Sequence, residues 1–158
     1  MVGVENDPIT AAITAALYPS AQIRNEGFET TRVPENSFAA TVGNVPFGGF
    51  VVHDPAHNAA RYSIHNHFVN KSLALTAPGG YVAVLTSRYT MDSTSDAARR
   101  DIAERAELIG ALRLPSRAWA SEVTSLTPDR PRAVSKRRKV SQPASSSAVV
   151  KSMPRISR

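Results

Sequence analysis

The chain of 158 residues contains no cysteine, which excludes disulfide bonds, thiolate nucleophiles and cysteine-based zinc sites. It also lacks an apolar run near the roughly 20 residues that a membrane-spanning helix needs. The N-terminus has neither the basic segment nor the apolar segment of a secretory signal. We therefore expect a soluble protein of the cytoplasm that has no membrane partner.

Excess basic charge is absent from most of the chain and is concentrated near its C-terminus. Residues 1–125 carry 10 Lys and Arg against 12 Asp and Glu, whereas residues 126–158 carry 9 Lys and Arg and one Asp. The net charge of +6 therefore describes the tail rather than the folded part. Because the C-terminal segment is rich in Pro, Ser, Lys and Arg, we predict a domain over residues 1–119 and a disordered basic tail over residues 120–158.

Short apolar runs alternate with segments of helical periodicity. Asp7-Pro8 forms a helix start, because aspartate caps the first turn and proline suits the first helical position. The expected helices are residues 8–17, 62–76 and 93–106, and the expected strands are residues 1–5, 21–28, 38–44, 81–87 and 108–114. This alternation predicts an α/β fold with a parallel sheet that is covered on both faces.

Four polar segments follow the expected strands, at the ends where ligands bind in sheets of this kind. They are Glu5, Glu26–Phe28, Asn44–Phe47 and Thr86–Tyr89. Because the carboxyl ends of parallel strands share one edge of the sheet, we expect these segments to form a site.

The stretch "GNVPFGGF", residues 43–50, is richer than an ordinary turn requires. Proline or glycine alone would end the preceding strand. The asparagine and the aromatic residue are additional. Taken alone, the tetrapeptide Asn44–Phe47 is also compatible with a strand exit and a buried phenylalanine, since short motifs match by chance.

Together with its neighbours, this stretch resembles the N6-adenine DNA methyltransferases of the class I, S-adenosylmethionine-dependent type. The similarity is greatest to the methylase module of large plasmid- and phage-borne proteins that also carry a helicase. It covers about residues 2–119, and the blocks that carry it are "VGVENDPITAAITAALYP", "GNVPFG", "HNHFVNKSL", "APGGYVAVLTSRYTMD" and "LIGALRLP". The resemblance implies a Rossmann-like sheet.

The resemblance also implies a cofactor side of the site. Glu5, the acid at the end of its strand, would bind the ribose hydroxyls of S-adenosylmethionine, because a carboxylate accepts hydrogen bonds from both. Glu26 and Phe28 lie where the family contacts the adenine of the cofactor. A structural role for Glu5 beside the dipole of the following helix stays open.

On the other side of the site, Asn44–Phe47 matches the family's catalytic tetrapeptide. The Asn44 side chain and the backbone carbonyl of Val45 would accept the two hydrogens of the amino group of an extruded adenine. These bonds would turn the nitrogen lone pair toward the methyl donor, which is catalysis by positioning. Pro46 would stiffen the loop, and Phe47 would stack on the base.

The sequence departs from the family in three ways. Val45 stands where the family usually has proline; only the backbone carbonyl is needed there, so we expect the change to be tolerated but to loosen the loop. The family's first strand and its glycine-rich cofactor loop would lie upstream of residue 1, and no target-recognition region is visible. We therefore expect a truncated methyltransferase that is inactive or nearly so alone, with a helicase or the remaining methyltransferase part as a possible partner.

Other polar residues receive simpler interpretations. His53 and His57 are four residues apart, but Pro55 lies between them, so we expect no metal site. We expect His65 and His67 to pack or to contact loops. Lys71 is expected to be a solvated or phosphate-facing charge.

The sequence is also compatible with two other functions. The chain could be a non-catalytic DNA-binding protein that acts through its basic tail, which carries "KRRK" at residues 136–139. It could also methylate RNA or a protein glutamine, because similar asparagine-proline-aromatic loops serve those substrates.

Overall fold

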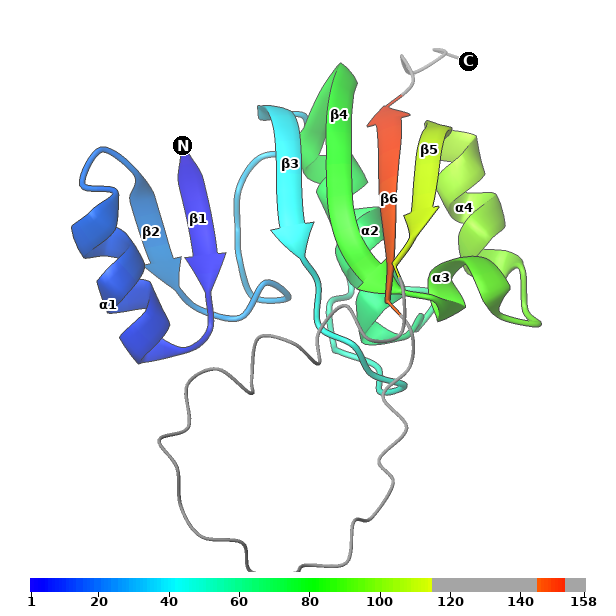
Figure 1. Ribbon diagram of the computed structural model, residues 1–158, viewed down its shortest axis with the longest axis horizontal. Helices are drawn as coiled ribbons and strands as arrows, with labels where there is room; N and C mark the ends of the chain where they lie inside the picture. The colour runs from blue at the N-terminus through cyan, green and yellow to red at the C-terminus, as the bar shows by residue number, and fades with distance from the viewer. Residues whose placement is uncertain (115–144, 153–158) are drawn as a thin grey trace, which may run out of the picture.

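The computed structural model describes residues 1–114 and 145–152 (Figure 1). The strands are β1 (Val2–Glu5), β2 (Gln22–Asn25), β3 (Phe38–Asn44), β4 (Thr76–Ser87), β5 (Ala106–Arg113) and β6 (Ser145–Ser152). The helices are α1 (Pro8–Leu17), α2 (Ile64–Leu75), α3 (Tyr89–Asp92) and α4 (Ala97–Arg105). The alternation of strands and helices confirms the α/β prediction.

The described strands form two sheets. β1 pairs in parallel with β2, and the second sheet has the order β3-β4-β6-β5. β3 and β4 are parallel, while β6 runs antiparallel to both of its neighbours. In Figure 1, β1 lies between β2 and the larger sheet, and the arrowheads of β1, β2, β3 and β4 point to the same edge. β1 and β3 are therefore edge strands of two sheets that share one strand direction.

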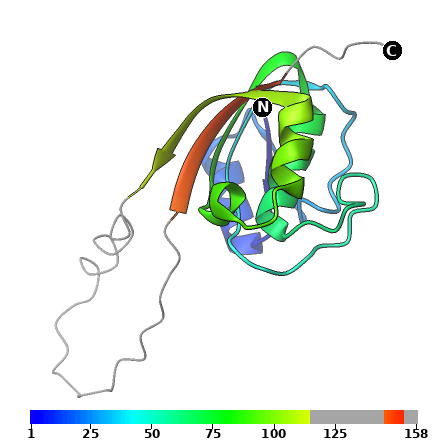
Figure 2. The same ribbon diagram turned by 90° about the vertical axis from the view of Figure 1, so that its right-hand side faces the viewer.

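Helix α2 forms most of the core with the larger sheet. Its Val69 and Leu73 pack against Val82 and Val84 of β4, together with Val45 and Ala106. Helices α2 and α4 lie on the same side of this sheet (Figure 2). The strictly alternating valines of β4 place one row of side chains in this core.

The beginning of β4 depends on two glycines. Gly79 has φ +82°, a conformation that residues with a side chain rarely adopt. A Cβ at Gly80 would lie 2.6 Å from the Ala39 carbonyl oxygen. The register between β3 and β4 shifts at the same place. The expected helix 62–76 and the expected strand 81–87 leave residues 77–80 as a connection, but these residues instead lie within a strand that already begins at Thr76.

Helix α1 forms where the sequence predicts it. The Asp7 side chain accepts a hydrogen bond from the Thr10 backbone N–H at 2.7 Å and caps the helix. The apolar positions Ile9, Ile13 and Leu17 nevertheless remain exposed, and Ala11 is the buried residue of this helix. Helical periodicity thus located the helix correctly but did not reveal which face packs.

Two other expectations need correction. The helix expected over residues 93–106 is shorter and forms α4 over Ala97–Arg105, and the extended backbone of Ser93, with ψ 140°, separates it from the short helix α3 that precedes it. Residues 145–152, which we expected to be disordered, form β6 between β4 and β5. The ladder joins backbone groups, so side-chain periodicity is not needed for it. The predicted boundary after residue 119 lies outside the described residues.

No helix among residues 1–114 has the length and apolar character that a membrane crossing requires.

Candidate functional site

The ends of the parallel strands meet as the sequence predicts. Glu5 lies opposite Asn25, the residue before Glu26, and Asn44 lies opposite Leu85, the residue before Thr86. In Figure 1 these ends lie at one edge of the two sheets. The structure therefore brings the four predicted segments to a common edge, although it divides them between two sheets.

The tetrapeptide Asn44–Phe47 leaves β3 with alternating exposure. Asn44 and Pro46 are exposed, and Phe47 is 41% exposed, so its ring is open to a ligand. Val45 is only 4% exposed, and its N–H donates to the Leu85 carbonyl at 3.0 Å. Because Val45 is held by the core and by this hydrogen bond, the expectation that valine loosens the loop is wrong.

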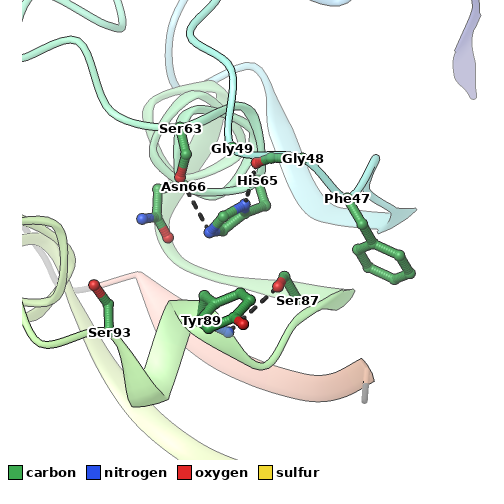
Figure 3. Close-up of a pocket in the computed structure, with 9 residues that line it drawn as sticks. All are labelled: Phe47, Gly48, Gly49, Ser63, His65, Asn66, Ser87, Tyr89 and Ser93. Atoms are coloured by element: carbon green, nitrogen blue, oxygen red, sulfur yellow. Dashed lines mark hydrogen bonds between the residues drawn. The ribbon is translucent and has the colours of Figure 1, made fainter. Parts of the chain in front are cut away.

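A pocket of about 420 Å³ opens beside Phe47 (Figure 3). Its walls come from the loop after β3, the start of α2 and the segment that follows β4. The lining residues are Phe47, Gly48, Gly49, Ser63, His65, Asn66, Ser87, Tyr89 and Ser93. Two partly exposed aromatic rings, Phe47 and Tyr89, thus border a cavity with several hydroxyl groups and one amide.

His65 joins two walls of this pocket. Its Nδ1 lies 3.1 Å from the Gly48 carbonyl oxygen, and its Nε2 lies 3.1 Å from Ser63 Oγ. A proton on Nδ1 satisfies both contacts, because Nδ1–H donates to the carbonyl and Nε2 accepts from the hydroxyl. Burial lowers the pKa of His65, although the bond to Gly48 acts in the opposite direction. His65 is therefore neutral, and its hydrogen bonds hold the loop after β3 against the start of α2.

Glu5 has contacts that suit a structural role. Its Oε1 accepts the Asp7 N–H at 2.9 Å just before α1 begins. The Asn25 amide donates to the Glu5 carbonyl at 2.9 Å and to the Asn6 carbonyl at 3.1 Å. The helix-approach role of Glu5 is thus present, and its half-buried carboxylate still lies at the strand edge.

The other two predicted cofactor residues, Glu26 and Phe28, make different kinds of contact. Glu26 Oε1 lies 3.7 Å from Arg24 Nη1. Phe28 instead packs on α2, with its ring centroid 4.8 Å from that of Phe68 and 6.3 Å from that of His67. Phe28 therefore contributes to packing between the loop after β2 and helix α2, and its assignment as a cofactor contact stays a prediction.

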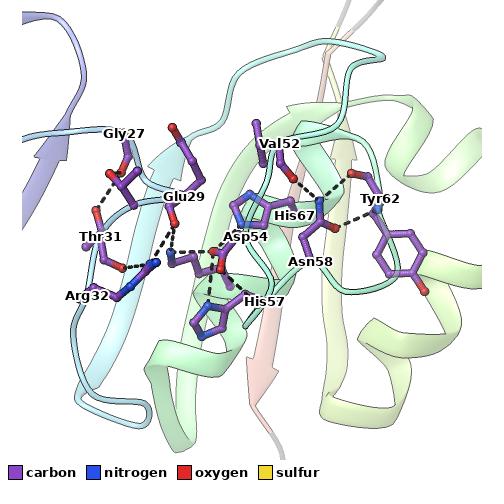
Figure 4. Close-up of polar contacts among 12 residues, drawn as sticks. Gly27, Glu29, Thr31, Arg32, Val52, Asp54, His57, Asn58, Tyr62 and His67 are labelled. Carbon is purple, nitrogen blue, oxygen red and sulfur yellow. Dashed lines mark hydrogen bonds and ion pairs between the residues drawn. The ribbon is translucent and has the colours of Figure 1, made fainter.

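The polar residues that sequence reasoning missed form a buried cluster around Asp54 (Figure 4). Lys71 Nζ donates to Asp54 Oδ2 at 2.8 Å, and His67 Nε2 donates to the same oxygen at 3.0 Å. The side chains of all three residues are fully buried. The expectation that Lys71 is a solvated or phosphate-facing charge is therefore wrong, because its partner Asp54 is buried beside it.

Lys71 also reaches the loop after β2. Its Nζ donates to the Glu29 carbonyl at 3.2 Å and lies 5.1 Å from the centre of the Phe28 ring. The Asp54 cluster thus connects α2 with two loops, one from each sheet.

The electrostatics of the cluster follow from its contacts. Burial alone would raise the pKa of Asp54, but hydrogen bonds from Lys71 and His67 and the charge of Lys71 hold that pKa well below its usual range. Burial lowers the pKa of His67, and Asp54 only partly opposes this effect. At neutral pH the carboxylate is therefore charged and His67 is neutral.

Neighbouring contacts order the rest of the loop. The Asn58 amide donates to the carbonyls of Val52 and Tyr62, and its Oδ1 accepts the Tyr62 N–H at 2.9 Å (Figure 4). His57 lies 3.4 Å from Asp54 and 3.7 Å from Glu35. Within residues 1–114 and 145–152, no group of three or more His, Asp or Glu side chains has an arrangement that could hold a metal ion.

Comparison with known proteins gives one sequence relative. No protein-family model matches the chain. The chain is 29% identical over 137 residues to "Defense against restriction protein B" of Escherichia phage P1. That match covers 82% of this chain and 6% of the phage protein.

Solved structures show a more extensive likeness. A putative class I S-adenosylmethionine-dependent methyltransferase from Listeria monocytogenes matches with TM-score 0.68 and 17% identity, over 97% of this chain and 44% of that protein. N-methyltransferase NodS from Bradyrhizobium japonicum, in complex with S-adenosyl-L-homocysteine, matches with TM-score 0.54 and 7% identity, over 96% of this chain and 65% of NodS. These matches confirm the Rossmann-like fold of class I methyltransferases.

Proposed function

We propose that this chain is the base-binding part of an S-adenosylmethionine-dependent methyltransferase that modifies N6 of adenine in DNA. One observation carries the proposal. Asn44 ends β3 with an exposed side chain, at the sheet edge that it shares with Glu5, and the neighbouring Phe47 borders an open pocket. An exposed amide followed by an exposed aromatic ring suits a flat, amino-bearing ligand.

The fold supports S-adenosylmethionine as the cofactor. The matched structures include methyltransferases, and one of them was solved with S-adenosyl-L-homocysteine. Glu5 fits a hydroxyl-bearing ligand, because its half-buried carboxylate lies at the strand edge and can accept further hydrogen bonds. When bound there, S-adenosylmethionine would supply the electrophilic methyl group.

The residues of the loop would supply positioning. The Asn44 side-chain carbonyl and the Val45 backbone carbonyl would accept the two hydrogens of the adenine amino group. This geometry would turn the lone pair on the nitrogen toward the methyl donor. The buried Val45 side chain would keep its carbonyl in place, since valine cannot move without opening the core.

The DNA substrate is supported by the tetrapeptide and by the phage relative. "NVPF" resembles the loop of adenine-specific enzymes, and the relative is a phage protein named for defence against restriction. Stacking on Phe47 requires an extruded base, because a base within a duplex cannot reach such a pocket.

The sheet topology supports the need for a further strand. β1 pairs with β2 and β3 pairs with β4, and no described strand joins β1 to β3. A strand parallel to both would convert the two sheets into one. We propose that sequence outside this chain, in the same gene product or in a partner such as a helicase-linked protein, supplies this strand and the cofactor loop. Turnover by the chain alone is therefore expected to be slow.

The test is methyl transfer to DNA by the purified chain. The chain is incubated overnight with plasmid DNA and excess S-adenosylmethionine, and the hydrolysed nucleosides are measured by mass spectrometry. The long incubation accumulates product from slow turnover. We expect N6-methyldeoxyadenosine above the level formed by Asn44→Ala, and the modified adenines are then located by sequencing.

The outcomes separate the parts of the proposal. Equal amounts of product with the wild type and with Asn44→Ala would reject the role of the tetrapeptide. A different methylated nucleoside would reject adenine as the target. Transfer to RNA in a parallel reaction, with none to DNA, would replace the proposed substrate. No methylated product at all, even after the long incubation, would reject slow turnover by this chain alone.

A further inference from the structure

The amide of Asn66 is an unusual feature of the pocket beside Phe47. Asn66 is 9% exposed and lines this pocket, and its Oδ1 is buried without a hydrogen-bond partner among the described residues. Figure 3 shows its side chain extending from α2 toward the segment that carries Tyr89 and Ser93. A buried polar atom without a partner costs roughly 1–3 kcal/mol, so its retention suggests a use.

Several other polar groups of the pocket wall already have partners. Both ring nitrogens of His65 have partners, as described above. Ser87 Oγ accepts the Tyr89 N–H at 3.3 Å, and the Tyr89 hydroxyl accepts from Arg88 at 3.1 Å. Asn66 therefore offers the pocket an amide whose oxygen is not committed to the protein.

We propose that Asn66 is a specificity-determining residue that hydrogen-bonds the ring edge of the purine base held in this pocket. The inference rests on the proposed function, because it assigns the ligand of the pocket as the base to be methylated. It adds a contact that the tetrapeptide does not provide.

The chemistry of an amide fits this role. If Asn44 and Val45 hold both hydrogens of the amino group, the remaining polar atoms of adenine are ring nitrogens, which accept hydrogen bonds. A half-turn about the Asn66 Cβ–Cγ bond exchanges its oxygen and nitrogen at almost no change of shape, so the amide can present its N–H₂ group. Phe47 and Tyr89 border the same space and can hold a flat base.

Asn70 provides a matched control. It lies one turn further along α2, is 3% exposed, and also has a buried Oδ1 without a described partner. It is not among the residues that line the pocket. Leucine has nearly the shape of asparagine, so Asn66→Leu and Asn70→Leu remove the amide and retain the volume.

The experiment compares stability and methylation in both variants. We expect the urea midpoints of Asn66→Leu and Asn70→Leu to be unchanged or higher, because neither amide oxygen loses a partner. We expect kcat/KM for DNA to fall roughly 5- to 150-fold in Asn66→Leu alone, the range for losing a specific base contact. If the Asn66 amide had only a structural role, its loss would not lower kcat/KM while leaving the urea midpoint unchanged.

A second measurement identifies the contacted atom. Oligonucleotide substrates are prepared in which the adenine that the protein methylates is replaced by 7-deazaadenine, 3-deazaadenine or 1-deazaadenine. We expect one analogue to reduce the wild-type rate and to cause no further loss in Asn66→Leu. Methylation by Asn66→Leu equal to that by Asn70→Leu would overturn the inference while leaving the proposed function intact. Absence of wild-type product would overturn both.

Discussion

The buried Lys71–Asp54 ion pair allows a sharp stability prediction. Lys71→Met removes the charge and two hydrogen bonds, to Asp54 Oδ2 at 2.8 Å and to the Glu29 carbonyl at 3.2 Å. Methionine keeps most of the aliphatic volume, so the change acts mainly through polarity. Asp54 would remain buried with neutral donors, the His67 ring at 3.0 Å and the His57 backbone N–H at 3.3 Å, and without a positive charge bonded to it.

The magnitude follows from the burial of the pair. Both side chains are fully buried, and removing one partner of such a pair costs about 3–5 kcal/mol. With a urea dependence of about 2 kcal/mol per M, the unfolding midpoint falls by roughly 1.5–2.5 M. That loss is a large part of the roughly 5–15 kcal/mol that stabilises an ordinary domain.

Urea unfolding followed by circular dichroism measures the effect. Arg100→Met is the matched control, because Arg100 lies 2.7 Å from Asp96 but the two side chains are 75% and 53% exposed. We expect that control to leave the midpoint unchanged within error. The double variant Lys71→Met/Asp54→Asn should be more stable than Lys71→Met, since it also removes the unpaired charge. A midpoint for Lys71→Met equal to that of Arg100→Met would refute the reasoning.

The remaining predictions concern pH and the loop. The pKa values of His65 and His67 are lowered by folding, so the unfolded chain binds more protons and the free energy of unfolding should fall as the pH drops below about 6.5. The lowered pKa of Asp54 adds a second loss below about pH 4. Urea midpoints measured from pH 7.5 to pH 3.5 check both signs, and midpoints that rise on acidification would contradict them. Val45→Pro introduces the residue that adenine-specific DNA methyltransferases usually have at this position. It should lower the free energy of unfolding by about 1–3 kcal/mol, because the Leu85 carbonyl loses its donor. Thermal or urea unfolding that matches the wild type would disprove this.

The local features of the fold could be predicted from the sequence. The Asp7-Pro8 cap and the apolar run Phe38–Asn44 each specify an element through neighbouring residues, and both elements have the predicted bounds. The shared edge of Glu5 and Asn44 follows from parallel pairing alone. β6 could not be predicted, because its partners are distant in sequence and its ladder uses backbone groups.

One feature of the sequence indicates the buried Asp54 cluster. Ile64, Phe68, Lys71 and Leu75 recur at spacings of four, three and four residues, so Lys71 occupies an inward-facing position of α2. A lysine at such a position indicates a buried partner. The identity of that partner was not readable, because Asp54 lies in a loop 17 residues earlier and reaches Lys71 only through the fold.

Helix α2 connects the two halves of the candidate site. Its first turn places His65 against the loop that carries Phe47, and Lys71 in its next turns bonds to Asp54 and to the Glu29 carbonyl. The two sheets share no hydrogen-bonded strand pair among the described residues, so these contacts are polar links between the β2 loop and the β3 loop. A shift of α2 would therefore move the predicted cofactor side and the predicted base side together, because both loops are attached to the same rigid helix.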